Sequence, residues 1–296
     1  MISDKYKRTD LARECKSDDI TSGSQIHGIS YTEENVSGFE LSLLDILSKE
    51  GEKTIGKPKG RYITIDVGKV WTLSDEKFNT CTELLSDQIK DMLKHVTGKD
   101  EIKNVLVAGL GNRYITSDAI GHETVKNIIV TRHIKDCDTK LYEMLGGKSV
   151  SAVTPGVIGQ TGIETLELIR GAVTNVKPEA VIVIDALAAG SLSHLATTVQ
   201  ITDTGLSPGS GIGNKRLAIN RDSLGCPVIA VGVPTVVESS TLVYAALEEA
   251  GIQNISPELT KVLENGRGFF VTPKESDIVT SEISRLLSEA VNLALS

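Results

Sequence analysis

The sequence of 296 residues has little of what several familiar protein classes depend on. It holds 4 cysteines and 1 tryptophan, and aromatic residues make up 4% of it. The cysteines at 15, 81, 137 and 226 form no CxxC pair, so neither a disulfide framework nor a zinc site is expected. No apolar run approaches the roughly 18 residues of a membrane helix, and the N-terminus lacks the apolar core of a signal peptide. We therefore expect reduced thiols and a cytoplasmic protein with no membrane partner.

Positive charge is also scarce. Asp and Glu number 39 and Lys and Arg 31, which gives a net charge of −8. A nucleic-acid backbone or an anionic membrane needs a basic face, so direct binding of nucleic acid is not expected.

Three common catalytic motifs are missing. There is no GxSxG elbow, and His122-Glu123 is followed by Lys126 where a zinc HExxH motif has its second histidine. The turn at residues 109–111 lacks the third glycine of a dinucleotide motif. No histidine is spaced as a metal ligand would be, and we expect no metal and no other cofactor.

Strand patterns do alternate with helix patterns. Strands are expected at 61–67, 104–109, 150–154, 181–185, 197–202 and 227–233, and helices at 74–98, 118–133, 163–175, 191–195, 235–250 and 276–295. This order predicts an α/β fold with three layers, α/β/α, around a mostly parallel sheet. We expect a single domain over residues 17–296, with the chain before about residue 60 as an appendage to it. Residues 1–16 are charged and aperiodic, which is typical of a mobile leader.

Two aspartates are the candidate catalytic residues. Four aliphatic residues, 181–184, lead directly into Asp185, and a carboxylate at the end of a buried strand is costly unless it is paired or used. Asp118 begins a predicted helix, where free N–H groups stabilise a carboxylate. Two neighbouring carboxyls can share a proton and activate water. The alternative is that Asp185 caps the following turn and Asp118 is an ordinary helix cap.

The glycine-rich stretch 203–216 is the second candidate feature. It lacks the Gly-Lys-Ser/Thr of a phosphate-binding loop, but its glycines allow the main chain to approach a ligand closely. Its backbone N–H groups can hold a peptide carbonyl or an oxyanion, and the alternative is a long rigid turn. The substrate-binding candidates are Asn112, Gly209, Ser210, Gly211, Asn214, Lys215 and Arg216.

Several stretches together resemble the germination protease family of spore-forming bacteria. They are Gly-Leu-Gly-Asn at 109–112, Pro-Gly-Val-Ile-Gly-Gln-Thr-Gly-Ile-Glu-Thr at 155–165, Ile-Asp-Ala-Leu-Ala-Ala at 184–189, the glycine-rich stretch, and Gly-Val-Pro-Thr-Val-Val at 232–237. The resemblance implies an endopeptidase that degrades small acid-soluble spore proteins in the spore core during germination. It also implies a homotetramer, Asp118 and Asp185 as the catalytic pair, and a fold similar to hydrogenase-maturation endopeptidases.

The leader and a few departures complete the comparison with the family. Residues 8–12, Arg-Thr-Asp-Leu-Ala, look like the junction at which a family zymogen loses its propeptide, which places the cut between Asp10 and Leu11. Gly190 stands where the family commonly has Arg, and Glu238 where it commonly has Asp. The stretch from Tyr244 to Phe270 is shorter than in longer members.

Two other functions stay open from the sequence. One is a maturation-type endopeptidase for another protein, and the other is a non-proteolytic binder of extended acidic peptides on the same scaffold.

Overall fold

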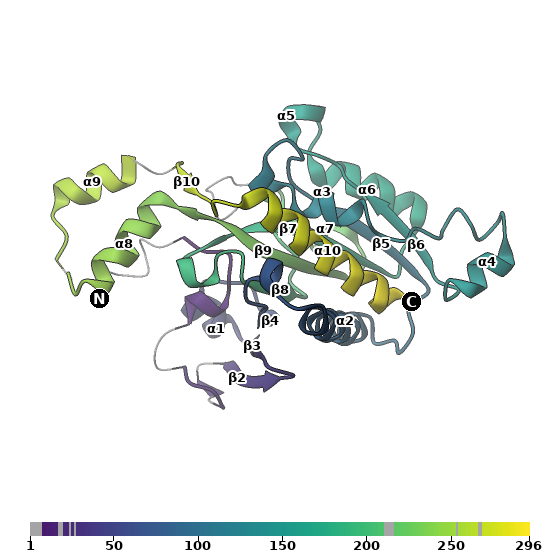
Figure 1. Ribbon diagram of the computed structural model, residues 1–296, viewed down its shortest axis with the longest axis horizontal. Helices are drawn as coiled ribbons and strands as arrows, with labels where there is room; N and C mark the ends of the chain where they lie inside the picture. The colour runs from purple at the N-terminus through teal and green to yellow at the C-terminus, as the bar shows by residue number, and fades with distance from the viewer. Residues whose placement is uncertain are drawn as a thin grey trace.

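A single mixed sheet organises the molecule. The computed structural model describes residues 8–16, 20–23, 25–26, 28–209, 216–252, 254–265 and 268–296. Within these residues ten strands join in the order β1-β2-β3-β4-β8-β9-β7-β5-β6, and β10 pairs with β9. Helices cover both faces of this sheet (Figure 1), which confirms the expected α/β class and its three layers.

The six expected strands are present as β4 to β9, and β1, β2, β3 and β10 are strands that were not predicted from the sequence. In chain order the strands are β1 (Gln25–Ile26), β2 (Ile29–Val36), β3 (Phe39–Ile46), β4 (Gly60–Asp66), β5 (Asn104–Gly109), β6 (Ser149–Val153), β7 (Ala180–Ala189), β8 (Thr198–Thr202), β9 (Val228–Glu238) and β10 (Phe270–Val271). Pairing is parallel among β9, β7, β5 and β6 and antiparallel elsewhere. The parallel block brings the carboxyl ends of β5, β7 and β9 to one edge, where α/β sheets form their ligand crevices.

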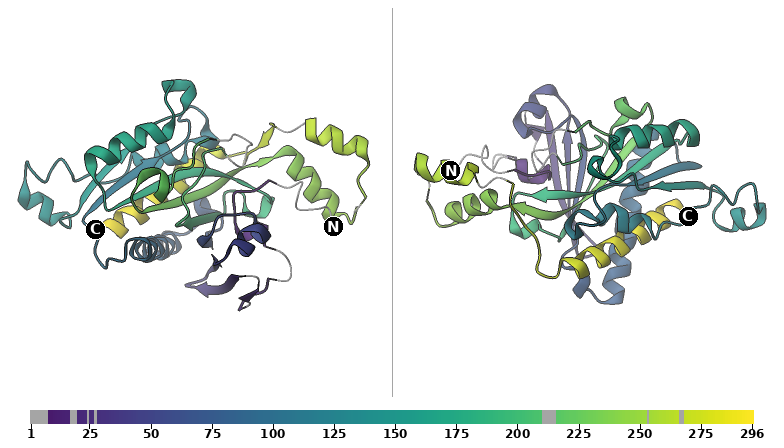
Figure 2. Two further views of the ribbon diagram at one scale, coloured as in Figure 1. Left: turned by 180° about the vertical axis from the view of Figure 1, so that it is seen from behind. Right: turned by 90° about the horizontal axis from the view of Figure 1, so that it is seen from above.

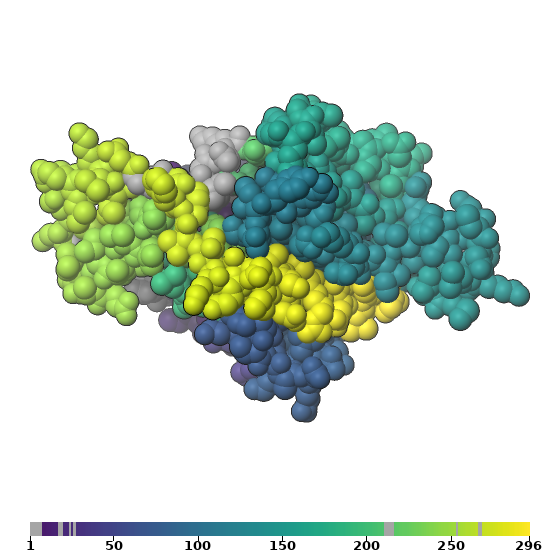
Figure 3. Space-filling model, turned by 45° about the horizontal axis from the view of Figure 1, so that its top comes forward, coloured from purple at the N-terminus to yellow at the C-terminus, as the bar shows by residue number. Residues whose placement is uncertain are grey.

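The helices divide the core into two layers. They are α1 (Lys49–Ile55), α2 (Asp75–Thr97), α3 (Ile120–Val125), α4 (Thr139–Met144), α5 (Ile158–Thr161), α6 (Thr165–Val176), α7 (Arg221–Leu224), α8 (Ser239–Glu249), α9 (Pro257–Asn265) and α10 (Ser276–Leu295). The larger core lies between the sheet and α2, α3 and α10, and the smaller one between the sheet and α6 and α7. Figure 3 shows α10 running across the front of the molecule above α2.

Helix α2 forms for the reasons visible in its sequence. Its apolar side chains recur at steps of three and four residues and are buried, among them Phe78, Leu85 and Ile89. Ser74 caps the N-terminus by accepting a hydrogen bond from Lys77 N, and Gly98 ends the helix with a positive φ of 68°. The expected cap at Ser74 and the end at Gly98 are both confirmed.

Two expected helices are shorter in the structure. The helix expected over 118–133 covers only α3, and Asp118 ends a short 3-10 helix, Thr116–Asp118, without capping the helix that follows. The helix expected from residue 235 begins at Ser239. Strand β9 continues to Glu238 because its last residues pair with the extension of β7 on one side and with β10 on the other.

The prediction that the first sixty residues are an appendage is wrong. Strands β2 and β3 continue the sheet from β4, and Leu41 and Ile63 pack in the main core. The expectation of a mobile leader is also wrong for residues 8–16, named here the docked segment. Leu11 and Ala12 are fully buried, and Ala12 packs in a third apolar cluster with β2, β3 and β4. A few apolar side chains are enough to attach a short polar stretch when the sheet offers them a surface.

One arm projects from this body. Helices α8 and α9 lead away from the sheet and return through β10, as both views of Figure 2 show. Buried Tyr244 and Leu263 form a small core of its own between its two helices. None of the helices in the described ranges is both long and apolar enough to cross a membrane.

Candidate active site

Asp185 lies at the carboxyl edge of the parallel strands. It follows the fully buried residues Val181–Ile184 of β7, and it is itself only 5% exposed. The parallel register sets it opposite Gly232 of β9. Packing of the aliphatic strand against both helical layers therefore forces this carboxyl into the interior.

Asp118 reaches the same edge through a loop that folds back. The loop begins after Gly109, the last residue of β5, and Gly111 lies in it with a φ of 92°. A Cβ at Gly111 would lie 2.0 Å from the backbone oxygen of Asp118, so only glycine permits this close approach. Asn112 N donates a hydrogen bond to Asp118 Oδ2 at 2.9 Å, and the Thr280 hydroxyl on α10 donates to Thr116 O at 3.1 Å. The loop is thereby tied at both its start and its end.

The two carboxyls are both biased toward the protonated form, but unequally. Burial raises the pKa of Asp185 well above its usual range, and the negative charges of Asp118 and Asp10 raise it further, against a backbone hydrogen bond from Ala186. Burial also raises the pKa of Asp118, opposed by the Asn112 hydrogen bond and by the charge of Arg216. Asp185 is therefore the carboxyl that keeps its proton to the higher pH, and Asp118 is the one that ionises first.

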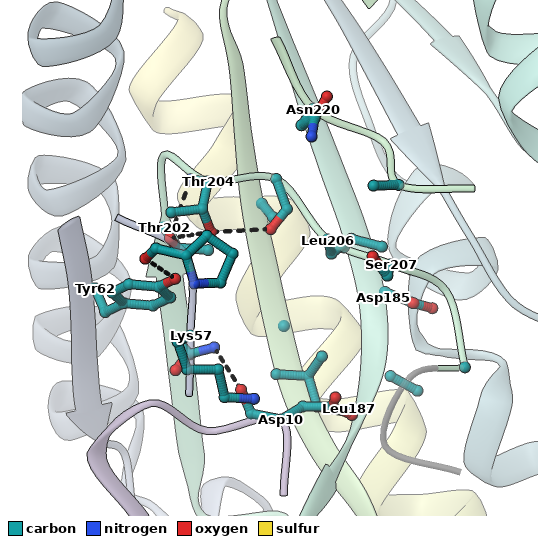
Figure 4. A pocket seen from close by; sticks show the side chains of 18 of the residues that line it. Asp10, Lys57, Tyr62, Asp185, Leu187, Thr202, Thr204, Leu206, Ser207 and Asn220 are labelled. Atoms are coloured by element: carbon teal, nitrogen blue, oxygen red, sulfur yellow. Dashed lines mark hydrogen bonds between the residues drawn. The ribbon is translucent and has the colours of Figure 1, made fainter. Parts of the chain in front are cut away.

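Two adjoining cavities, of about 280 and 270 Å³, meet at Asp185. The second contains Asp118 and Arg216, and both are lined by Asp10 and Gly209. In Figure 4 the first opens between Tyr62, Thr202 and Thr204 on one side and Asp185 on the other, with Asp10 and Leu187 at its lower end. The site is thus a groove rather than a closed pocket.

The docked segment enters this groove beside the end of β7 and then turns into a short 3-10 helix, Arg13–Cys15. Asp10 N donates to Ala188 O at 2.9 Å, and Ala188 N donates back to Asp10 Oδ2 at 2.9 Å. Lys57 Nζ donates to Thr9 O at 2.9 Å. One backbone bond and two bonds that involve side chains therefore hold Thr9 and Asp10 in the groove.

Glu14 anchors the docked segment beyond the groove. Its side chain is 7% exposed, and its two oxygens accept hydrogen bonds from Gly190 N at 2.7 Å and from His194 Nδ1 at 2.7 Å, the latter with the ring nitrogen as donor. Near the other end of the docked segment Arg8 pairs with buried Glu238 at 3.2 Å. Gly190 and Glu238, the two departures from the family pattern, therefore both contact the docked segment.

Comparison with known proteins agrees with this arrangement. The family model of germination protease, Peptidase_A25, matches residues 7–250. The chain belongs to the germination protease family. A germination protease of Caldanaerobacter subterraneus subsp. tengcongensis is 39% identical, with 97% of this chain and 94% of that protein aligned, and one of Clostridium acetobutylicum is 36% identical over the same shares. The chain is therefore a protease of a spore-germination family.

Among solved structures the hydrogenase maturation protease HycI from Thermococcus kodakarensis aligns at 16% identity and a TM-score of 0.36. The alignment covers 67% of this chain and 97% of that one. The fold of the present chain is established by its own strand order and register, and not by this alignment.

The substrate-binding candidates fall into three groups. Gly209 and Arg216 line the groove. Asn112 contributes its backbone N–H to Asp118, while its side-chain oxygen accepts hydrogen bonds from Gln160 Nε2 at 2.7 Å and Tyr114 N at 3.1 Å. Ser210, Gly211, Asn214 and Lys215 lie outside the described residues, and their roles stay predictions.

Sequence reasoning missed Glu14, His194 and Gln200. No role was expected of His194 from the sequence, and in the structure His194 binds the Glu14 carboxylate. The available signal for Gln200 was its strand: in Thr-Val-Gln-Ile-Thr it alternates with two aliphatic residues that face the larger core. Within the described residues, no three His, Cys, Asp or Glu side chains are grouped as metal ligands would be.

Proposed function

We propose that the chain is an endopeptidase that begins the degradation of small acid-soluble spore proteins during germination. The observation that carries this proposal is a pair of aspartates, Asp185 buried and Asp118 half-buried, that line a groove in which Asp10 is hydrogen-bonded to strand β7. By analogy with the family, we further propose that it works in the cytoplasm of the spore core and assembles as a homotetramer.

Asp118 and Asp185 would share the work of hydrolysis. Asp118, the more acidic of the two, takes a proton from a water molecule, whose oxygen then adds to the carbonyl carbon of the peptide bond. Asp185, which burial keeps protonated, donates its proton to the departing nitrogen as the C–N bond breaks. One acid end and one amine end result, and the pair regains its single shared proton.

We also propose that the chain is made as a zymogen that is cut between Asp10 and Leu11. Asp10 lines both cavities and contributes to the raised pKa of Asp185, which supports a position near the carboxyl pair. Its carboxylate is held by Ala188 N, so the groove already accepts an acidic residue at this position. In this state the docked segment also keeps other substrates out.

The test is cleavage of a purified small acid-soluble spore protein, with fragments and the enzyme's own N-terminus followed by mass spectrometry. We expect the substrate to be cut between an acidic residue and the apolar residue that follows it, and the enzyme to gain a new N-terminus at Leu11. Asp118→Asn and Asp185→Asn should each lower kcat by about 10⁴-fold or more while the fold is kept, because members of one catalytic unit fail together. Asp136→Asn, at an exposed position, serves as the matched control.

Four outcomes would contradict parts of this proposal. Near-full activity of either variant removes that aspartate from the mechanism. An unchanged N-terminus in a fully active enzyme rules out the zymogen. Absence of any cleavage of spore protein, with binding retained, would favour a non-proteolytic binder, and cleavage of a different protein alone would favour a maturation-type endopeptidase.

A further inference from the structure

Gln200 lies in the same row of the sheet as Asp185. The antiparallel register of β8 and β9 sets Gln200 beside Gly232, and the parallel register of β7 and β9 sets Asp185 on the other side of Gly232. Cross-strand neighbours point to the same face, and strands lie about 4.8 Å apart. Gln200 and Asp185 therefore flank Gly232 on one face, with about 10 Å between their backbones.

The space over Gly232 is filled by the side chain of Leu187. A Cβ at Gly232 would lie 2.5 Å from Leu187 Cδ1, so glycine is what leaves room for Leu187 between Gln200 and Asp185. Gln200, Leu187 and Asp185 line one cavity together with Asp10 of the docked segment. The docked segment therefore meets the row from within this cavity.

The Gln200 amide forms hydrogen bonds with the backbone on both sides of Leu11. Its Nε2 donates to Asp10 O at 3.3 Å, and its Oε1 accepts from Ala12 N at 2.7 Å. The side chain is buried, at 6% exposure for the residue, and these two bonds fix which way its amide points. Asp10 O is the carbonyl oxygen of the Asp10–Leu11 peptide bond, the bond that we propose is cut.

We propose that Gln200 is a further catalytic residue of this site. Its amide N–H binds the carbonyl oxygen of the bond that is cut, and its amide oxygen fixes the backbone N–H two residues further on. As water adds to the carbonyl carbon, that oxygen gains negative charge, and the hydrogen bond from Nε2 strengthens. When the C–N bond breaks, the charge returns to the carbonyl and the bond weakens again.

Gln200 contacts only backbone atoms of the docked segment, so the role applies to any substrate whose backbone follows the path of residues 10–12. A substrate that enters the groove must replace the docked segment, and its own carbonyl and N–H then meet the same amide. The inference rests on the proposed endopeptidase activity, and its test distinguishes the two.

The first test compares three variants on a spore protein and on a peptide with the sequence of residues 8–16. Gln200→Met keeps the length and removes both hydrogen bonds, whereas Gln200→Glu keeps an acceptor for the N–H and removes the donor. We expect kcat to fall about 10²- to 10³-fold in both, as for loss of one oxyanion donor, and KM to rise more in Gln200→Met. Gln88→Glu, the same exchange on the distant helix α2, should match the unsubstituted enzyme.

The second test uses the unsubstituted enzyme and does not depend on how a variant folds. A peptide N-methylated at the position of Ala12 lacks the N–H that Gln200 accepts, and a peptide methylated at the position of Glu14 is its control. We expect KM to rise about 3- to 10-fold for the first peptide relative to the second, as for one lost hydrogen bond, and no such difference in Gln200→Met.

The results distinguish failure of the proposed role of Gln200 from failure of the proposed function. If the unsubstituted enzyme cuts its substrate and both Gln200 variants keep its kcat, Gln200 is not catalytic and the proposed function stands. If the two methylated peptides are cut equally well, the backbone contact is not made and the inference is overturned. If the unsubstituted enzyme cuts neither spore protein nor peptide, the proposed function fails and the inference fails with it.

Discussion

Removing the Glu14 carboxylate should release the docked segment from the groove. Glu14 is almost fully buried, and it holds Gly190 N and His194 Nδ1 at 2.7 Å each, besides the hydroxyl of Thr9. Hydrogen bonds to a charged group contribute about 1.5–3 kcal/mol each. With partial relaxation, Glu14→Ala should cost about 2–4 kcal/mol of local stability, which raises the open population by about 30- to 900-fold.

Amide hydrogen exchange measures this opening directly. Asp10 N–H is held by Ala188 O and Ala12 N–H by Gln200 Oε1, so both should exchange about 30- to 900-fold faster in Glu14→Ala. Amides in the centre of β7, such as Val183, should keep their rates. Cleavage of added spore protein should also begin sooner, because the groove is vacated more often.

A matched control is Glu34→Ala, which removes an exposed carboxylate from β2. Unchanged exchange at Asp10 and Ala12 in a folded Glu14→Ala protein would refute the reasoning, since Glu14 would then not anchor the segment. Faster exchange throughout β7 would refute it as well, because the effect would be global rather than local.

Two further predictions concern Asp185 and Gly209. The pKa of Asp185 is raised in the folded state, so the protein loses stability as pH rises above the ordinary Asp range near 4. Asp185→Asn removes this loss. The variant should therefore melt at a higher temperature than the unsubstituted protein at neutral pH, and at the same temperature below about pH 3. Melting curves at several pH values check this, and a constant difference at all pH values would contradict it. Gly209 has a φ of 70° and lines both cavities. Gly209→Val should therefore strain the loop and lower kcat/KM by about tenfold or more, while the melting temperature changes little. Equal losses of activity and of stability would make this glycine purely structural.

The local pattern of residues was enough to predict much of the framework. The period of apolar residues and the caps at Ser74 and Gly98 define α2 without reference to the rest of the chain. The unbroken aliphatic run before Asp185 indicates a strand covered on both faces, and such a strand buries the carboxyl that ends it. These features depend only on residues that are close together in the chain, so the sequence alone is enough to predict them.

Other predictions failed where pairing between distant segments overrode the local pattern. Strand β9 continues to Glu238 because its last residues pair with β7 and with β10, although a helix was expected from residue 235. The first sixty residues join the sheet because β4 offers them an edge. Leu11 and Ala12 are too few to predict a buried segment, and Ala12 is buried only because it packs against β2, β3 and β4.

The candidate site likewise combines a residue that the sequence identifies with residues that only the tertiary structure brings to it. Asp185 can be identified from its own strand, because burial of a carboxyl at the end of an aliphatic run is a local property. Its partners cannot: Asp118 arrives through a loop closed by Thr280, and Gln200 arrives through the antiparallel pairing of β8 with β9. The register of distant strands, with a glycine between them, places Gln200 and Asp185 in one row of the sheet and in the lining of one cavity. Register is set by the packing of whole strands, and no single stretch of the chain contains that information.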